Sequence, residues 1–450
     1  MKPYKIPQHR PKMPDWHAHQ HLFARTNYRK LMWKRIVRVS LLTTVIVVAV
    51  YSVTQCFQWI GAKDDIASET KASTADDTKI RVDDKQLARE LLQDTAIINL
   101  HDPSFQIKHQ NTTLQVETSI NSSLQTYMLQ KLDRKNSRHI ALLAMDPSSG
   151  EIVMMAGFDK RNPDNNTCLV NSYPAASIFK IVTAAAAAEQ KGLDSNAKMR
   201  FNGSQHTLYK TQLKDRNNRY TNHTTFQAAF AKSINPVFGK LGALSLKQAT
   251  LSTYAQAFGF NSHINFELPV PPSQFNISDA PYHWAEIASG FNRQTTLSAI
   301  HAAMLPTVIL NQGKQIEPTV IRQITNGSGE VLYQNRPSLA KQVITPMASR
   351  VVYDLMEATV RYGTARKAFK GFQKDAVLSK CNLGGKTGSI FNKKHDLRYD
   401  WFVGFADLKN GDQKLALAVV VAHEEYIGIR AAAYARMIIK KYYADLFTTG

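Results

Sequence analysis

The segment YPAASIFKIVTAAAAAEQKG, residues 173–192, places a serine and a lysine three positions apart and then continues into five consecutive alanines. A proline and small residues lead into a helix that should begin near Ser177 and end near Gly192, because glycine favours helix ends. Residues i and i+3 lie on the same face of a helix, so Ser177 and Lys180 should be adjacent. The alanines allow close packing on every side, which predicts a central, buried helix.

This pairing suits nucleophilic catalysis. A serine hydroxyl is a weak nucleophile until a base accepts its proton, and a lysine is such a base only where burial and nearby cations lower its pKa. The spacing alone is not specific, because Ser-x-x-Lys begins at Ser68, Ser177, Ser195 and Ser338. Only Ser177 is preceded by proline and small residues and followed by a long apolar helix, which selects it as the candidate nucleophile.

Apolar runs on both sides of this helix indicate a β-sheet. Residues 139–158 (HIALLAMDPSSGEIVMMAGF) are two apolar runs around a cluster of turn formers, which predicts a hairpin. Three short runs rich in β-branched and aromatic residues follow far downstream at 382–390, 399–408 and 414–423. Their short connections favour antiparallel neighbours. The sequence therefore predicts one sheet closed by both ends of the domain, with a final helix at 431–447.

Two further motifs contain polar residues suited to chemistry. SINPVF contributes Ser233 and Asn235, although Ser-x-Asn is common in turns and helix caps. GGKTGSI contributes Lys386, Thr387 and Gly388 on a predicted strand. Glycines within a strand mark a close approach to the backbone, and the lysine and threonine offer a cation and a hydroxyl to a carboxylate. A phosphate-binding loop is excluded, because that motif needs an earlier glycine and a following helix.

The N-terminal region has the pattern of a membrane anchor. Residues 1–38 contain ten Lys and Arg against a single acid, in a chain of net charge +21. Residues 39–62 contain no charged side chain and are long enough to cross a bilayer, which needs about 20 apolar residues. A core helix or a cleaved signal peptide fits these lengths poorly. The positive-inside rule then predicts a cytoplasmic tail at 1–38, and a stalk or linker at 63–114 outside the membrane.

The three motifs, in this order, resemble the signature of penicillin-binding proteins and their serine β-lactamase relatives. The usual second element of that signature is Ser-Asp-Asn, whereas Ile234 is the middle residue here. The resemblance covers residues 115–447 and looks most like the transpeptidase half of the bifunctional members without their glycosyltransferase domain. The segments that support it beyond the motifs are VETSINSSLQ (116–125), LLAMDPSSGEIVMMAG (142–157), TTFQAAFAKSINPVF (224–238), ASGFNRQTTLSAIHAAML (288–305), YGTARKAF (362–369) and DWFVGFA (400–406).

The resemblance implies a fold and a set of roles. The implied fold is α/β (α+β), with a five-stranded antiparallel sheet flanked by helices, an all-helical lobe, and the active site between them. Ser177 would be the acylated nucleophile and Lys180 its base, while backbone N–H groups of Ser177 and Ser389 would stabilise the charge that develops on the carbonyl oxygen. The implied catalytic residues are Ser177, Lys180, Ser233, Asn235 and Lys386. The implied substrate-binding residues are Thr387, Gly388 and Ser389, with the terminal carboxylate held by Lys386 and Thr387.

The expected function is that of a membrane-anchored peptidoglycan D,D-transpeptidase that cross-links stem peptides and is inhibited by β-lactams. The catalytic domain would lie in the periplasm, anchored in the bacterial inner membrane through residues 39–62. No metal, cofactor or nucleic acid is expected. A separate glycosyltransferase is one expected partner, because only about 50 residues separate the predicted span from the domain.

Two other functions stay open at this point. One is a hydrolase, either a D,D-carboxypeptidase or a β-lactamase, although no Glu-x-x-Leu-Asn segment lies between Asn235 and Lys386. The other is a β-lactam sensor or scaffold without catalysis. Cys168 and Cys381 would share an oxidising compartment and are a candidate disulfide pair.

Overall fold

The computed structural model describes residues 84–449, except 93–94, 96, 337–340 and 393. The predicted cytoplasmic tail, the predicted membrane span and residues 63–83 of the predicted stalk lie outside this described part. Among the residues that are described, no helix has both the length and the apolar character that crossing a bilayer requires.

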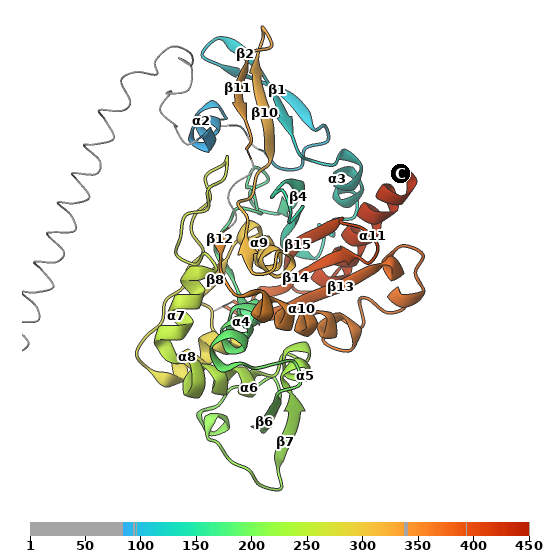
Figure 1. The fold of residues 1–450 in the computed structure, drawn as a ribbon. Coiled ribbons are helices and arrows are strands. Elements are labelled where there is room, and N and C mark those ends of the chain that lie inside the picture. Colours follow the sequence, from blue (N-terminus) through green and yellow to red (C-terminus); the bar gives the residue numbers. More distant parts are fainter. Residues whose placement is uncertain (1–83, 93–94, 96, 337–340, 393, 450) are drawn as a thin grey trace, which may run out of the picture. The chain divides into compact units, whose positions relative to one another are not determined.

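A five-stranded antiparallel sheet lies at the centre of the described part (Figure 1). The predicted hairpin forms β3 and β4, and the three downstream runs form β13, β14 and β15, so the predicted sheet is confirmed. Strand β15 pairs with β3, which joins the two ends of the domain. In spatial order the strands are β13 (Cys381–Phe391), β14 (Arg398–Leu408), β15 (Lys414–His423), β3 (Ser137–Met145) and β4 (Ile152–Asp159).

Helices cover both faces of this sheet because its strands are apolar on both faces. Ile140 and Leu142 pack in one cluster with helices α3 (Ser122–Leu129) and α11 (Ala431–Thr449). Ala141 and Leu143 pack in the other cluster with α4 (Lys180–Lys191) and α9 (Ala299–Leu310). Side chains alternate between the faces of a strand, so neighbouring residues of β3 enter different cores.

Helix α4 is the predicted central helix. Its residues from Lys180 to Ala188 are buried, and Gly192 ends it in the left-handed conformation (φ 60°). The start differs from the prediction, because residues Ala176–Phe179 form a 3₁₀ turn before the α-helix begins. Since side chains at i and i+3 eclipse one another in a 3₁₀ turn, this geometry still brings Ser177 next to Lys180.

The region beside the sheet is mainly helical but not all-helical, which corrects the prediction. Strands β6 (Lys198–Asn202) and β7 (Thr221–Thr225) form a hairpin within it. Strand β6 alternates the apolar residues Met199 and Phe201 with polar ones, but over only five residues, and β7 has no apolar residue at all, so the strand pattern is too short to recognise. The helices of this region are α5 (Phe226–Ala231), α6 (Asn235–Lys240), α7 (Lys247–Ala257) and α8 (Pro281–Ser289), with a π-helical segment at Leu241–Leu246; α10 (Pro346–Arg361) packs against α4, α5 and α9.

A second sheet, of four strands, was not predicted. It contains β1 (Ser104–His109), β2 (Thr112–Thr118), β10 (Ile321–Asn326) and β11 (Val331–Gln334) in that order. Strand β1 and helix α2 (Asp84–Leu91) fall within the range expected to be a stalk, and β1 pairs with β2 along its whole length. The compact part of the chain therefore begins earlier than residue 115. Two shorter ladders pair β5 (Tyr173–Pro174) with β8 (Thr296–Leu297), and β9 (Lys314–Gln315) with β12 (Lys341–Gln342).

Cys168 and Cys381 are both free and buried, so they do not form the candidate disulfide. Cys168 belongs to the cluster around α4, and Cys381 belongs to the cluster around α11. The two thiols are thus in different cores, which only the three-dimensional arrangement of the strands reveals.

Candidate active site

Ser177 and Lys180 meet at the start of α4. The Lys180 Nζ atom lies 2.8 Å from Ser177 Oγ and 2.8 Å from Asn235 Oδ1, and it also donates to the carbonyl oxygen of Ser289. The Lys180 side chain is fully buried, whereas Ser177 is half-buried. The amine is therefore held behind the hydroxyl, on the side away from solvent.

The environment of Lys180 favours its neutral form. Burial lowers the pKa of Lys180 well below its usual value, and the positive charge of Lys386 lowers it further. Removing an ammonium from water is costly, and a second cation nearby adds repulsion. A neutral Lys180 amine is a base within hydrogen-bond reach of the Ser177 proton.

Ser233 and Lys386 extend this contact into a chain of hydrogen bonds. Ser233 Oγ donates to Ser177 Oγ at 3.0 Å, and Lys386 Nζ donates to Ser233 Oγ at 3.0 Å. Lys386 is fully buried, and burial lowers its pKa to about 7. Ser233 adopts a positive φ of 57°, an uncommon backbone conformation for a residue other than glycine. The backbone thus holds the Ser233 hydroxyl between Ser177 and Lys386.

Asn235 fixes the other side of the lysine. Its Oδ1 accepts a hydrogen bond from Lys180. Its Nδ2 donates to the carbonyl oxygen of His206 at 3.0 Å, and its backbone N–H donates to the carbonyl oxygen of Gln205 at 2.7 Å. Ile234 is buried and is the N-cap residue of α6, so its apolar side chain packs in the core. The middle position of this motif therefore contributes packing rather than a polar group.

Strand β13 forms the opposite wall, as an edge strand of the five-stranded sheet. A Cβ atom added to Gly388 would lie 3.3 Å from both Ala176 Cβ and Ile178 Cγ1, so the strand packs tightly against the turn that holds Ser177. The Thr387 hydroxyl lies 2.5 Å from the Thr364 hydroxyl. The edge position leaves one side of the β13 backbone without a strand neighbour.

Packing within the sheet explains why glycines occupy positions 384 and 385, just before Lys386. Cβ atoms at Gly384 and Gly385 would collide with the rings of Phe405 and Phe402 on β14. The close approach expected at these glycines is therefore made by aromatic side chains of the neighbouring strand.

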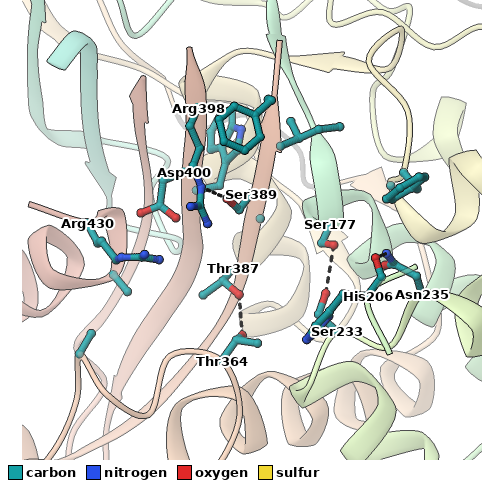
Figure 2. Close-up of a pocket in the computed structure, with 18 of the residues that line it drawn as sticks. Ser177, His206, Ser233, Asn235, Thr364, Thr387, Ser389, Arg398, Asp400 and Arg430 are labelled. Atoms are coloured by element: carbon teal, nitrogen blue, oxygen red, sulfur yellow. Dashed lines mark hydrogen bonds between the residues drawn. The ribbon is translucent and has the colours of Figure 1, made fainter. Parts of the chain in front are cut away.

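A cavity of about 730 Å³ lies between the helical region and β13 (Figure 2). Lys180 and Lys386 are absent from its wall because they are buried behind it. The structure thus brings all eight predicted site residues to one place. The predicted residues that line the cavity are Ser177, Ser233, Asn235, Thr387, Gly388 and Ser389.

Several lining residues were missed by the sequence analysis. Thr364 lies in a segment that supported the family resemblance, yet nothing in its own sequence marked it as a site residue. Arg398 and Asp400 lie on β14, and the pairing of Ser389 with Asp400 places them beside the motif strand. His206 and Arg430 come from loops without a recognisable pattern.

Together the fold and the site define a mixed α/β protein with a Ser–Lys pair in a cleft between a sheet and a helical region. The chain belongs to the penicillin-binding protein transpeptidase family, because the family model described as "Penicillin binding protein transpeptidase domain" matches residues 140–440. The resemblance stated from the motifs is thereby confirmed.

Individual relatives are distant. The chain is 24% identical over 323 residues to the peptidoglycan D,D-transpeptidase PbpA of Mycolicibacterium smegmatis. The aligned region covers 62% of this chain and 61% of that protein. The D,D-transpeptidase domain of a peptidoglycan glycosyltransferase from Eggerthella lenta superimposes with a TM-score of 0.57 at 24% identity, covering 74% of this chain and 83% of that one. The imipenem acyl-enzyme complex of penicillin-binding protein A from M. tuberculosis gives a TM-score of 0.59 at 20% identity, and the match covers 73% of this chain and 79% of that chain. At these identities the structural matches establish the fold.

Proposed function

We propose that this protein is a membrane-anchored peptidoglycan D,D-transpeptidase that works through an acyl-enzyme on Ser177. The observation that carries this proposal is the continuous set of contacts from Lys386 through Ser233 and Ser177 to Lys180, placed at the wall of a cavity. Membership of the transpeptidase family supports the same chemistry.

In the acylation step the Ser177 oxygen attacks the carbonyl carbon between the two D-alanines of a stem peptide. Lys180 accepts the hydroxyl proton, and the C–N bond breaks as the leaving D-alanine nitrogen takes up a proton through Ser233. The buried lysine suits the first transfer because its pKa is lowered. Backbone N–H groups of Ser177 and Ser389 would stabilise the oxyanion.

Lys386 and Thr387 bind the terminal carboxylate of the stem peptide in this mechanism. The Thr387 hydroxyl lines the cavity and can donate to a carboxylate, and a protonated Lys386 behind it adds a favourable positive charge. The unpaired side of β13 can also bond an extended peptide, as strand addition does in other peptide-binding proteins.

In the second step an amine from a neighbouring stem peptide attacks the ester carbon, and the Ser177 oxygen leaves with a proton. The product is a cross-link, and the enzyme is regenerated. Attack by water instead would give a D,D-carboxypeptidase or a β-lactamase. β-Lactams would inhibit by forming the same ester on Ser177 and occupying the cavity.

The location of the enzyme follows from the residues outside the described part. The charge pattern supports a cytoplasmic tail at 1–38 and a membrane span at 39–62, which would place the catalytic domain on the periplasmic side. A separate glycosyltransferase would supply the glycan strands to be cross-linked.

The test is covalent labelling of the full-length protein in detergent with a fluorescent penicillin. Wild type should form a long-lived adduct, and Ser177→Ala should form none. Ser195→Ala is the matched control, because Ser195 begins another Ser-x-x-Lys tetrad outside the cavity and its loss should leave labelling intact.

Stem-peptide turnover then separates the functions. Release of D-alanine with transfer to an added amine supports a transpeptidase, whereas release without transfer identifies a carboxypeptidase. Rapid loss of the penicillin adduct identifies a β-lactamase, and a stable adduct without peptide turnover identifies a sensor. Absence of any adduct in wild type refutes the proposal.

A further inference from the structure

Three cations line the active-site cavity, and the proposed mechanism uses none of them. They are Lys367, Arg398 and Arg430. Figure 2 shows both arginines on the side of Thr387 and Ser389 away from Ser177. The only acidic residue among those that line the cavity is Asp400.

Asp400 does not neutralise these cations. It is only 8% exposed, and its Oδ2 atom accepts the backbone N–H of Ala431 at 2.9 Å, at the first residue of α11. The positive end of that 19-residue helix already offsets the carboxylate. Among the described residues, the one ion-pair contact of Asp400 is with His423, at 3.9 Å.

The cations therefore retain binding capacity. Arg398 donates its Nε to Ser389 Oγ at 3.0 Å and lies 5.7 Å from the ring centre of Phe391, which holds the guanidinium in place. Its two terminal nitrogens make no hydrogen bond within the described chain. The side chains of Arg430 and Lys367 are exposed and have no ion-pair partner there either. Guanidinium groups bind carboxylates in a planar, two-bond geometry, so two that line one cavity are suited to receive a carboxylate.

The direction of β13 indicates which part of a substrate would reach this receptor. Thr387, Ser389 and Phe391 alternate onto the same face, and Phe391 is paired with Arg398. The proposed function places the terminal carboxylate at Thr387 and the scissile carbonyl near Ser389. The residues that precede the scissile bond then continue along β13 toward Phe391 and Arg398.

We propose that Arg398 and Arg430, assisted by Lys367, bind a second carboxylate of the stem peptide, on the residue that precedes D-Ala-D-Ala. The inference rests on the proposed function, because that function sets the direction of the peptide. Such a receptor would make the enzyme prefer stem peptides in which this carboxylate is free over those in which it is a carboxamide.

The experiment uses two synthetic stem peptides that differ only in this group, a carboxylate in one and a carboxamide in the other. Each is tested on full-length protein in detergent, first as a donor (kcat/KM for D-alanine release) and also as a competitor of fluorescent penicillin labelling. We expect the free carboxylate to be preferred about tenfold in wild type, the size expected for bonds to a charged group. The preference should shrink as salt is added.

Single substitutions locate the receptor. Arg430→Gln and Arg398→Gln should each reduce the preference to about threefold, and Arg430→Lys should retain more of it than Arg430→Gln. Arg366→Gln is the matched control, because Arg366 is exposed, carries the same charge and does not line the cavity. It should keep the full preference. Melting temperatures verify that the variants are folded.

Three outcomes would overturn the inference. Equal use of the two peptides by wild type excludes the receptor, and so does a preference that survives both arginine substitutions. A preference that falls equally in Arg366→Gln indicates general attraction by the basic surface instead of a local site. If penicillin labels Ser177 and the two peptides compete equally, only this inference fails. If penicillin does not label the protein, the proposed function fails and the inference fails with it.

Discussion

Replacing Gly290 by alanine tests whether the position of Ser177 depends on contact with the end of α8. Gly290 caps α8 with a left-handed backbone (φ 67°). A Cβ atom there would overlap the carbonyl group of Ala176 and lie 2.8 Å from Ser177 N. Gly192, which caps α4 at φ 60°, has no atom within 4 Å of the corresponding Cβ position. Gly192→Ala is therefore a control with the same backbone strain and no collision.

The expected losses of stability and of acylation rate follow from these distances. Each alanine costs about 1 kcal/mol for its left-handed conformation. The 2.8 Å approach to Ser177 N is about 0.7 Å shorter than an ordinary contact of about 3.5 Å, and the overlap with Ala176 is larger. The 3₁₀ turn or the α8 terminus must then move by about 1 Å. A displacement of that size at a reacting group can reduce the rate about 100-fold.

The assay is the second-order rate constant for penicillin acylation, measured beside the melting temperature. Gly192→Ala should lower the melting temperature by about 2 °C and leave acylation near the wild-type rate. Gly290→Ala should lower it further and slow acylation about 100-fold. Equal behaviour of the two variants in both measurements would show that the contact between α8 and the Ser177 turn does not position the nucleophile.

Three further predictions concern titratable groups. Acylation of wild type should rise with pH and level off below the usual lysine value of 10.5, because burial and Lys386 lower the pKa of Lys180; a rate that climbs without a plateau to pH 10.5 would exclude Lys180 as the base. Lys386→Met should flatten the pH dependence of stability. Between the folded pKa of about 7 and the unfolded value near 10.5, the unfolded chain binds more protons than the folded one. The free energy of unfolding of wild type therefore rises by roughly 1.4 kcal/mol per pH unit from this group. Chemical denaturation at pH 7, 8 and 9 measures the slope, and parallel curves for the two proteins would contradict the prediction. Cys168 and Cys381 should resist alkylation in the native protein, because both are buried and burial raises the pKa of Cys168 to about 12 and that of Cys381 to about 11. Both should react after denaturation without a reductant, and a thiol that stays protected would reveal a disulfide.

The parts of the fold that the sequence predicted are those with strong local patterns. Strands β3, β4 and β15 are mainly apolar runs, β13 and β14 are rich in glycine, aromatic and β-branched residues, and α4 is an alanine-rich helix that ends at a glycine. The strands of the four-stranded sheet and of the β6–β7 hairpin are short. Their apolar residues alternate only once or twice, as Phe105 and Ile107 do in β1 and Leu114 and Val116 do in β2, and β7 has no apolar residue, so the pattern was too brief to predict them. Strands β2 and β10 are about 200 residues apart in sequence, and their pairing is a tertiary contact.

The sequence by itself determined the family, the order of the three motifs and the identity of the candidate nucleophile, because these depend on which residues occur at fixed local spacings. Only the tertiary structure decided how the motifs meet. Lys180, Ser233 and Lys386 lie far apart in sequence. Burial lowers the pKa of both lysines, and the charge of Lys386 lowers that of Lys180 further, which happens only in the folded chain. The arginines at the sheet side of the cavity show the same principle, since Arg398 and Arg430 have no sequence motif and become a candidate carboxylate receptor only because β14 and the loop before α11 bring them to one cavity.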